Sequence, residues 1–167
     1  MENTEFPNRK INRLKDWDYS SNGGYFITIC TNDKMHLFGT ICVGGGALDA
    51  TIVELSAFGK IVENEIIRMN DIYDNIIVTD YVIMPNHIHF ILMIKGRSGA
   101  PAPTRANAII PQYISTLKRF TNKKCNSDLW QRSYYDHIIC NEADYVEKRN
   151  YIQTNPAKWL CDEYYSD

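Results

Sequence analysis

The stretch VIMPNHIHFILMI, residues 82–94, places two histidines one residue apart in a run that is otherwise almost entirely apolar. A short apolar run that follows turn residues is typical of a buried β-strand, and Pro85 with Asn86 predicts the turn. Side chains alternate along a strand, so we expect His87 and His89 on the same face of a sheet. The role of this face depends on the elements that surround the strand.

The hydrophobic periodicity of the flanking segments predicts an α+β domain. Spacings of three and four residues indicate helices, while short apolar runs bounded by turn residues indicate strands, and Asn141 is the expected N-cap of the last helix. The order strand, helix, strand, strand, helix, strand is that of a ferredoxin-like split βαβ sheet, here followed by a C-terminal helix. The first two strands are expected to pair with each other. Strands are predicted at 23–31, 36–43, 75–84, 87–94 and 128–140, and helices at 56–72, 109–124 and 142–155.

Length and composition favour one domain that spans residues 1–167. Apolar residues make up 44% of the chain, enough for a core. The sequence predicts neither a membrane span nor a secretory signal, so we expect a cytoplasmic protein. The five cysteines never occur in a CxxC spacing, so no disulfide framework or cysteine zinc site is expected. A basic N-terminal arm (about 1–20) and a flexible Gly/Pro-rich loop (about 96–106) are predicted.

Positive charge is clustered although the formal net charge is only −2. Each cluster alone is typical of a solvated surface, but several together can form a surface that binds a polyanion. The residues that would contribute to such a surface are Arg9, Lys10, Arg13, Lys118, Arg119 and Lys148.

The paired histidines allow two interpretations. Neutral imidazole binds divalent metals, and a strand can hold two rings close enough for one ion. The alternative is a hydrogen-bonded pair with a purely structural role. Histidine-triad hydrolases would need a third histidine at the next alternate position, which is Ile91.

Several separated blocks resemble one known family. MPNHIH resembles the His-hydrophobic-His strand of HUH endonucleases, in the form found in REP-associated tyrosine transposases and their insertion-sequence relatives. The blocks DYSSNGGYFITICT, LFG, WQRSYYDHII and YIQTNPAKW are similar to that family in the same order, from about Arg13 to Trp159. The resemblance implies a transposase that cuts and rejoins single-stranded or hairpin DNA through a 5′-phosphotyrosine, with Mg²⁺ or Mn²⁺ bound by the histidines. It also implies that the six basic residues named above contact DNA phosphates.

The resemblance also implies that Tyr151 is the nucleophile, on the C-terminal helix. Helix geometry agrees, because Tyr145, Val146 and Ile152 form the predicted apolar stripe and Tyr151 lies on another side. In related transposases a polar residue one turn after the tyrosine completes the metal site. Asn155 matches that place.

Three questions stay open at this stage. Pro156 disfavours helical geometry at Asn155, so this residue is either a third metal ligand or the end of the helix. The chain is either a transposase or a non-catalytic single-stranded or hairpin DNA-binding protein descended from one. It acts either as a monomer or as a homodimer that shares its tyrosine helices.

Overall fold

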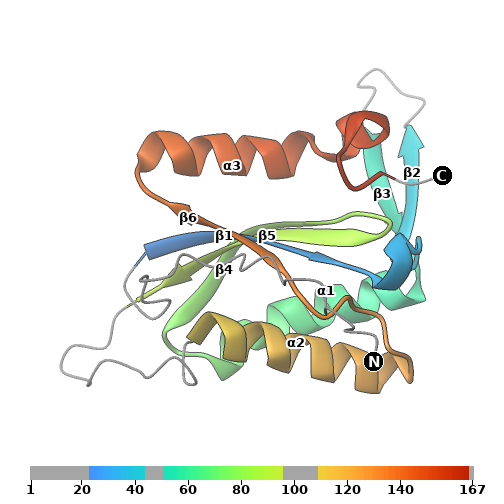
Figure 1. Cartoon of the computed structure of the whole chain (residues 1–167), viewed down its shortest axis with the longest axis horizontal. Helices are drawn as coiled ribbons and strands as arrows, with labels where there is room; N and C mark the ends of the chain where they lie inside the picture. The colour runs from blue at the N-terminus through green and yellow to red at the C-terminus, as the bar shows by residue number, and fades with distance from the viewer. Residues whose placement is uncertain (1–22, 44–50, 96–108, 166–167) are drawn as a thin grey trace, which may run out of the picture.

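The computed structural model describes residues 23–43, 51–95 and 109–165, and these build a four-stranded antiparallel sheet with helices on both faces (Figure 1). The strands follow the order β4-β5-β1-β6 across the sheet, so the histidine strand β5 and the first strand β1 are central. The predicted N-terminal arm and the 96–106 loop lie outside the described residues. The strands are β1 (Gly23–Cys30), β4 (Ile76–Ile83), β5 (His87–Ile94) and β6 (Tyr135–Ile139).

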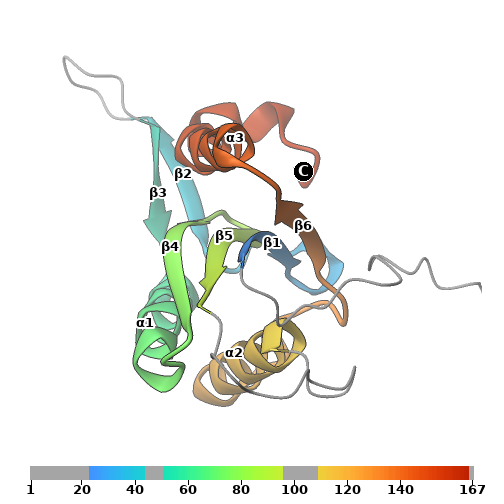
Figure 2. The same ribbon diagram turned by 90° about the vertical axis from the view of Figure 1, so that its left-hand side faces the viewer.

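Two helices cover one face of the sheet and a third covers the other (Figure 2). On the first face lie α1 (Ala57–Ile72) and α2 (Ile109–Cys125), and on the second lies α3 (Glu142–Thr154). A mixed α and β architecture with an antiparallel sheet is therefore confirmed. None of the helices in the described part of the chain has the length and apolar character needed to cross a membrane.

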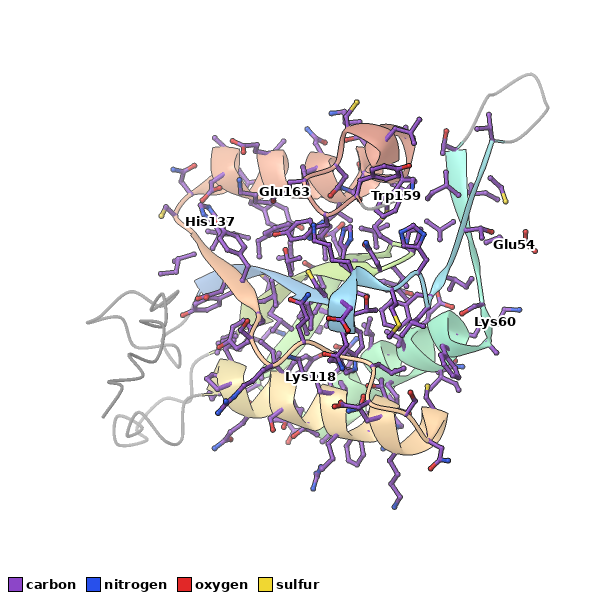
Figure 3. The ribbon with its side chains drawn as sticks, turned by 45° about the vertical axis from the view of Figure 1, so that its right-hand side comes forward. Glu54, Lys60, Lys118, His137, Trp159 and Glu163 are labelled. Atoms are coloured by element: carbon purple, nitrogen blue, oxygen red, sulfur yellow. The ribbon has the colours of Figure 1, made fainter. Side chains whose placement is uncertain are left out.

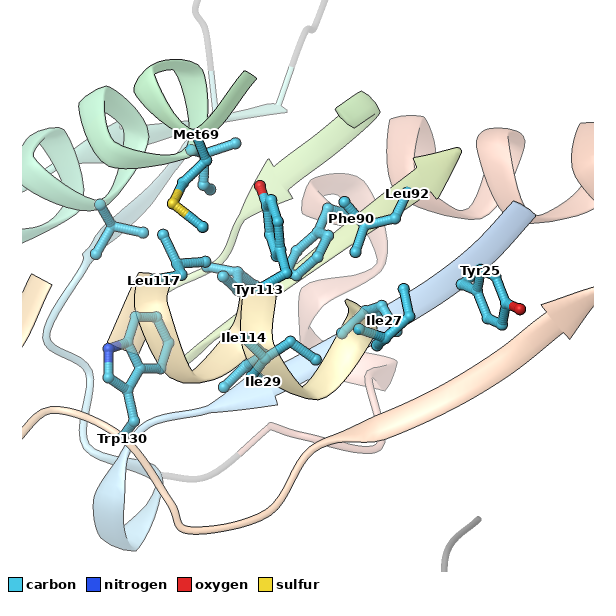
Figure 4. Close-up of a cluster of buried hydrophobic side chains, with 14 of the residues drawn as sticks. Tyr25, Ile27, Ile29, Met69, Phe90, Leu92, Tyr113, Ile114, Leu117 and Trp130 are labelled. Atoms are coloured by element: carbon cyan, nitrogen blue, oxygen red, sulfur yellow. The ribbon is translucent and has the colours of Figure 1, made fainter. Parts of the chain in front are cut away.

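The main core lies between the sheet and the helices α1 and α2 (Figure 4). Its strand side is formed by the side chains of β1 and β5 that point toward these helices, among them Ile27, Ile29 and Phe90, all 0% exposed. Central strands covered on both faces need apolar side chains on both sides, which explains why residues 87–94 form a nearly continuous apolar run.

Helix α1 begins where the sequence predicts. The Ser56 hydroxyl caps it by accepting a hydrogen bond of 3.1 Å from the backbone N–H of Gly59. A Cβ atom at Gly59 would lie 2.1 Å from the carbonyl oxygen of Phe38, so only glycine allows the helix to approach that segment this closely.

The predicted pairing of the first two strands is wrong. Strand β2 (Gly39–Val43) pairs with β3 (Thr51–Leu55) in a separate two-stranded sheet. The reason is that β1 uses its two hydrogen-bonding edges for β5 and β6, which leaves no edge for β2. Strand β3 was not predicted, and β6 is shorter than the predicted 128–140 strand.

Candidate active site

The two histidines lie on the sheet face that α3 covers. In the pairing of β1 with β5, His89 is opposite Thr28 and His87 is opposite Cys30, so the two imidazoles share one face as predicted. Both rings are buried, with exposed fractions of 0% for His87 and 1% for His89. Buried polar rings require hydrogen-bond partners, and these partners determine what the histidines can do.

Hydrogen bonds fix which ring nitrogens carry protons. The amide nitrogen of Asn86 donates to the carbonyl oxygens of Tyr164 and Lys34, so its Oδ1 faces Nδ1 of His87 at 2.8 Å and accepts a hydrogen bond from the Nδ1–H group. Nε2 of His87 is then an acceptor, 2.9 Å from Nε2 of His89. The second ring donates in that bond and accepts from the hydroxyl of Thr28 at 2.7 Å through Nδ1.

Both histidines are held in the neutral form. Burial lowers the pKa of His87 to about 4, an effect that the nearby carboxylate of Asp162 partly offsets. Burial also lowers the pKa of His89 well below its ordinary value, and the neighbouring His87 lowers it further. Neutral imidazole is the form that binds a metal ion, so the site is suited to a cation without prior loss of a proton to solvent.

Helix α3 brings Tyr151 to these rings. The helix begins at the predicted N-cap, since Oδ1 of Asn141 accepts from the backbone N–H of Asp144 at 3.0 Å. The ring of Tyr151 packs edge-on against His89, with ring centroids 5.1 Å apart, and its hydroxyl is 3.5 Å from Oδ2 of Asp162. The predicted apolar stripe of α3 is wrong in one position, because Val146 is 44% exposed.

Tyr151 is protonated at rest. Burial is the main reason that its pKa is raised to about 12, and the negative charges of Asp162 and Glu163 add to this effect. A phenol with this pKa is a weak nucleophile at neutral pH, so chemistry at Tyr151 requires a change in its surroundings when a substrate or a cation binds.

Asn155 lies at the junction of α3 and a 3-10 helix, η3 (Pro156–Cys161). The expected departure from helical geometry before Pro156 is wrong, since Asn155 has φ −57° and ψ −44°. The proline occupies the first position of η3, so the chain continues from one helix into the next. The side chain of Asn155 makes no capping hydrogen bond.

The amide of Asn155 instead reaches a carboxylate that the sequence analysis missed. Its Nδ2 donates to Oδ2 of Asp162 at 2.6 Å, which fixes the orientation of the amide. Its Oδ1 is buried and has no hydrogen-bond partner in the described part of the protein. One ligand atom each from His87, His89 and Asp162 lies within 4.8 Å of the other two. The site thus contains two imidazole nitrogens, the carboxylate of Asp162 and the amide oxygen of Asn155. These are ligand types that bind divalent cations.

A cleft of about 270 Å³ opens beside Tyr151 and His89. Aromatic rings line the cleft, together with the imidazole of His137 from β6 and the ammonium group of Lys148 from α3. Nε2 of His137 donates a hydrogen bond of 2.9 Å to the carboxylate of Asp144. The pKa of that carboxyl is lowered mainly by the hydrogen bond from the backbone N–H of Cys140, and His137 lowers it further. The cleft is lined by Phe26, Thr28, His89, Tyr135, His137, Lys148, Tyr151, Glu163 and Tyr164.

The basic residues expected at DNA are divided between different parts of the molecule. Lys148 lines the cleft, where it forms an ion pair of 2.8 Å with Glu147. Lys118 lies on the opposite side of the sheet from His137 and Glu163 (Figure 3). Its Nζ donates to backbone carbonyls of residues 131–133, and burial lowers its pKa to about 8. Arg119 lies over the ring of Phe120 at 5.0 Å, and Arg9, Lys10 and Arg13 lie outside the described residues.

The structure thus brings together His87, His89, Tyr151 and Asn155, as predicted from the sequence. It adds Asp162, for which the sequence carries no periodic signal, and Tyr164, whose ring lies 4.8 Å from that of His87. The feature of the sequence that points to Asp162 is its position as an acidic residue shortly after the helix that carries Tyr151.

Relatives of this chain differ in how much of it they match. An uncharacterized protein from Haemophilus influenzae is 31% identical over 99% of this chain and 97% of its own length. A REP-associated tyrosine transposase from Escherichia coli K12 is 26% identical, in a match that covers 48% of this chain and 44% of that protein. No protein-family model matches the chain.

The fold is similar to a solved structure of a REP-associated tyrosine transposase bound to a REP hairpin. The TM-score is 0.60 at 18% sequence identity, and the superposition covers 87% of this chain and 74% of the other. At this level of identity the likeness concerns the fold alone.

Proposed function

We propose that this chain, which belongs to the same family as the uncharacterized Haemophilus influenzae protein, is a metal-dependent transposase that cuts and rejoins single-stranded DNA through Tyr151. The observation that carries the proposal is the packing of the Tyr151 ring against His89, whose Nε2 faces that of His87. Tyr151 on α3 and His89 on the central strand β5, far apart in sequence, line the same cleft.

The fold supports this assignment. Each strand of the sheet is antiparallel to its neighbours, in the order β4-β5-β1-β6. Strands β1 and β4 are therefore parallel to each other with β5 between them, and β5 and β6 are parallel to each other with β1 between them. We assign this order to the ferredoxin-like split βαβ class, with α3 as the added C-terminal helix that carries Tyr151. The similar fold of a transposase bound to a REP hairpin and the E. coli relative point the same way.

The histidines are suited to hold Mg²⁺ or Mn²⁺, with Asn155 as a further ligand through its orphaned Oδ1. A bound divalent cation acts as a Lewis acid toward a non-bridging phosphate oxygen. Nε2 of His87 is unprotonated and can bind a cation, because the hydrogen bond to Asn86 keeps the ring proton on Nδ1 of His87. His89 can present Nε2 as well once its proton moves to Nδ1, where the Thr28 hydroxyl turns from donor to acceptor.

The chemical step that we propose exchanges one ester for another. The phenol oxygen of Tyr151 attacks the phosphorus, loses its proton and forms a new P–O bond. The bond to the 3′ oxygen breaks, and that oxygen leaves as a 3′-hydroxyl after it gains a proton. The DNA keeps a 5′ phosphotyrosine linkage that a later 3′-hydroxyl can reverse, so no ATP is required.

A single strand suits this cleft better than a duplex. Bases of a single strand can stack on exposed aromatic rings, and Tyr135 at the cleft is 48% exposed. Lys148 provides positive charge for a phosphate at the same place. The predicted contacts by Lys118 and Arg119 concern another face of the protein, and those by Arg9, Lys10 and Arg13 stay predictions. Tyr151 lies against His89 of its own chain, so one chain contains all the residues of the proposed site, and a homodimer that shares its tyrosine helices stays a prediction.

The test uses purified full-length protein with labelled DNA hairpins that carry single-stranded flanks. We expect cleavage of the flank in Mg²⁺ or Mn²⁺, loss of cleavage in the His87→Ala, His89→Ala double variant, and no cleavage of the matching duplex. Hairpin binding by both proteins without cleavage by either would favour the non-catalytic DNA-binding alternative.

A further inference from the structure

Asp162 lies where a third metal ligand is needed. It follows η3, and its carboxylate belongs to the one group of histidine, cysteine and acidic side chains among the described residues that can hold an ion, together with His87 and His89. The fold brings it there from beyond the helix that carries Tyr151, whereas both histidines come from β5.

The carboxylate of Asp162 is oriented by neutral donors. The amide Nδ2 of Asn155 donates to Oδ2 at 2.6 Å, and the backbone N–H of Tyr164 donates to Oδ1 at 2.7 Å. None of the ion pairs formed by the described residues includes this carboxylate. Among the described residues this partly buried anion therefore has no cationic partner beside the two neutral imidazoles, and its Oδ1, which accepts one hydrogen bond, retains a lone pair for a cation.

We propose that Asp162 is an anionic ligand of the divalent cation, beside His87 and His89, and that the amide nitrogen of Asn155 positions it. This inference rests on the proposed metal site. It gives the site a carboxylate as well as two imidazoles, a donor set that suits Mn²⁺ because oxygen ligands favour hard cations. Asn155 then acts on the site through Asp162, whatever its own oxygen binds.

A ligand in this position links the cation to the C-terminal segment, residues 162–165. The ring of Tyr164 in this segment lies 4.8 Å from His87 and 5.6 Å from His89, and its carbonyl accepts from Asn86 at 2.9 Å. Binding of a cation by Asp162 would hold the beginning of this segment against the histidines. Metal binding should therefore reduce the local unfolding of residues 162–165.

The experiment measures Mn²⁺ affinity from the signal of free Mn²⁺ in electron paramagnetic resonance, with chelator-treated full-length protein. Since even the groups around metal ligands affect affinity by about 10 to 100-fold, Asp162→Asn should weaken Mn²⁺ binding by at least about 10-fold. The control is Glu142→Gln, which removes an exposed carboxylate from the first turn of α3, outside the cleft and outside the three-residue group. Its Mn²⁺ affinity should equal that of the unaltered protein.

The outcomes separate the two proposals. If Asp162→Asn binds Mn²⁺ as tightly as the unaltered protein while the double histidine variant does not bind, Asp162 is no ligand and the histidine site stands. If the double histidine variant also binds normally, the proposed metal site itself fails. Hydrogen exchange of the unaltered protein is an independent measurement, in which Mn²⁺ should slow exchange at residues 162–165. Unchanged exchange there would contradict the inference without any substitution.

Discussion

The two faces of the central sheet differ in what they bury. Toward α1 and α2 the sheet presents an apolar layer to which many large side chains contribute. Toward α3 the buried apolar cluster formed by the described residues consists of Phe26, Ile91 and Ile152, and the other buried positions on this face include His87 and His89. Most of the apolar burial that stabilises the fold is therefore on one face, while the other face buries polar rings that are held by hydrogen bonds.

Removing a large side chain from the apolar face should have the largest effect on stability. Phe90 is 0% exposed in the main core, so Phe90→Ala should lower the free energy of unfolding by about 3 to 5 kcal/mol. Urea denaturation measures this loss. The control is Ile67→Ala, at a position that is 52% exposed, where we expect a change within about 0.5 kcal/mol. A loss at Phe90 no larger than at Ile67 would contradict the assignment of stability to this face.

The polar face should make stability depend on pH. The folded-state pKa of His87 is lowered to about 4 and that of His89 is also lowered, while unfolded histidine titrates near ~6.5. Between these pH values the unfolded chain binds more protons, so the metal-free protein should lose stability as the pH falls from about 6.5 toward 4, by about 1 to 3 kcal/mol. Melting temperatures across this range test the effect.

The control for the pH effect is the His87→Gln, His89→Gln variant. Glutamine does not titrate, and the carboxylates are the same in both proteins, so the difference between the two pH profiles isolates the histidines. Parallel profiles would mean that the rings are not held neutral by burial.

Tyr151 should have the smallest effect on stability. Tyr151→Phe keeps the ring contacts with Phe26 and His89 and removes a hydroxyl whose hydrogen bond to Asp162 is 3.5 Å long. We expect a change in the free energy of unfolding below about 1 kcal/mol and unaltered Mn²⁺ binding. Thermal melting and an Mn²⁺ titration check both. A loss as large as that of Phe90→Ala would make Tyr151 a core residue and remove the contrast between the faces.

The sequence predicted the apolar face better than the polar one. Helix α1 and strand β5 were predicted with bounds close to those observed because their periodicity and turn residues are local signals. The strands that pair with β1 were not predicted, because this pairing depends on which strands from distant parts of the sequence occupy the two edges of β1. The histidine pair followed from strand alternation alone.

The contribution of Asp162 to the site could not be predicted in the same way. It reaches the histidines because Asn155 stays helical before Pro156 and the chain enters η3 without a break. The local bias before proline predicts the opposite, so this path depends on tertiary structure. The exposure of Val146 has a similar origin, since α3 packs on the sheet along a narrower apolar stripe than its sequence predicts.

The central claim is that the polar face carries out DNA cleavage through Tyr151. The most direct measurement is incubation of the protein with labelled single-stranded hairpin DNA and Mn²⁺, followed by denaturing electrophoresis and peptide mapping of the labelled protein. We predict a covalent DNA adduct on Tyr151 that is absent from Tyr151→Phe, although this variant still binds the hairpin. An adduct on another tyrosine, or one that persists in Tyr151→Phe, would contradict the account.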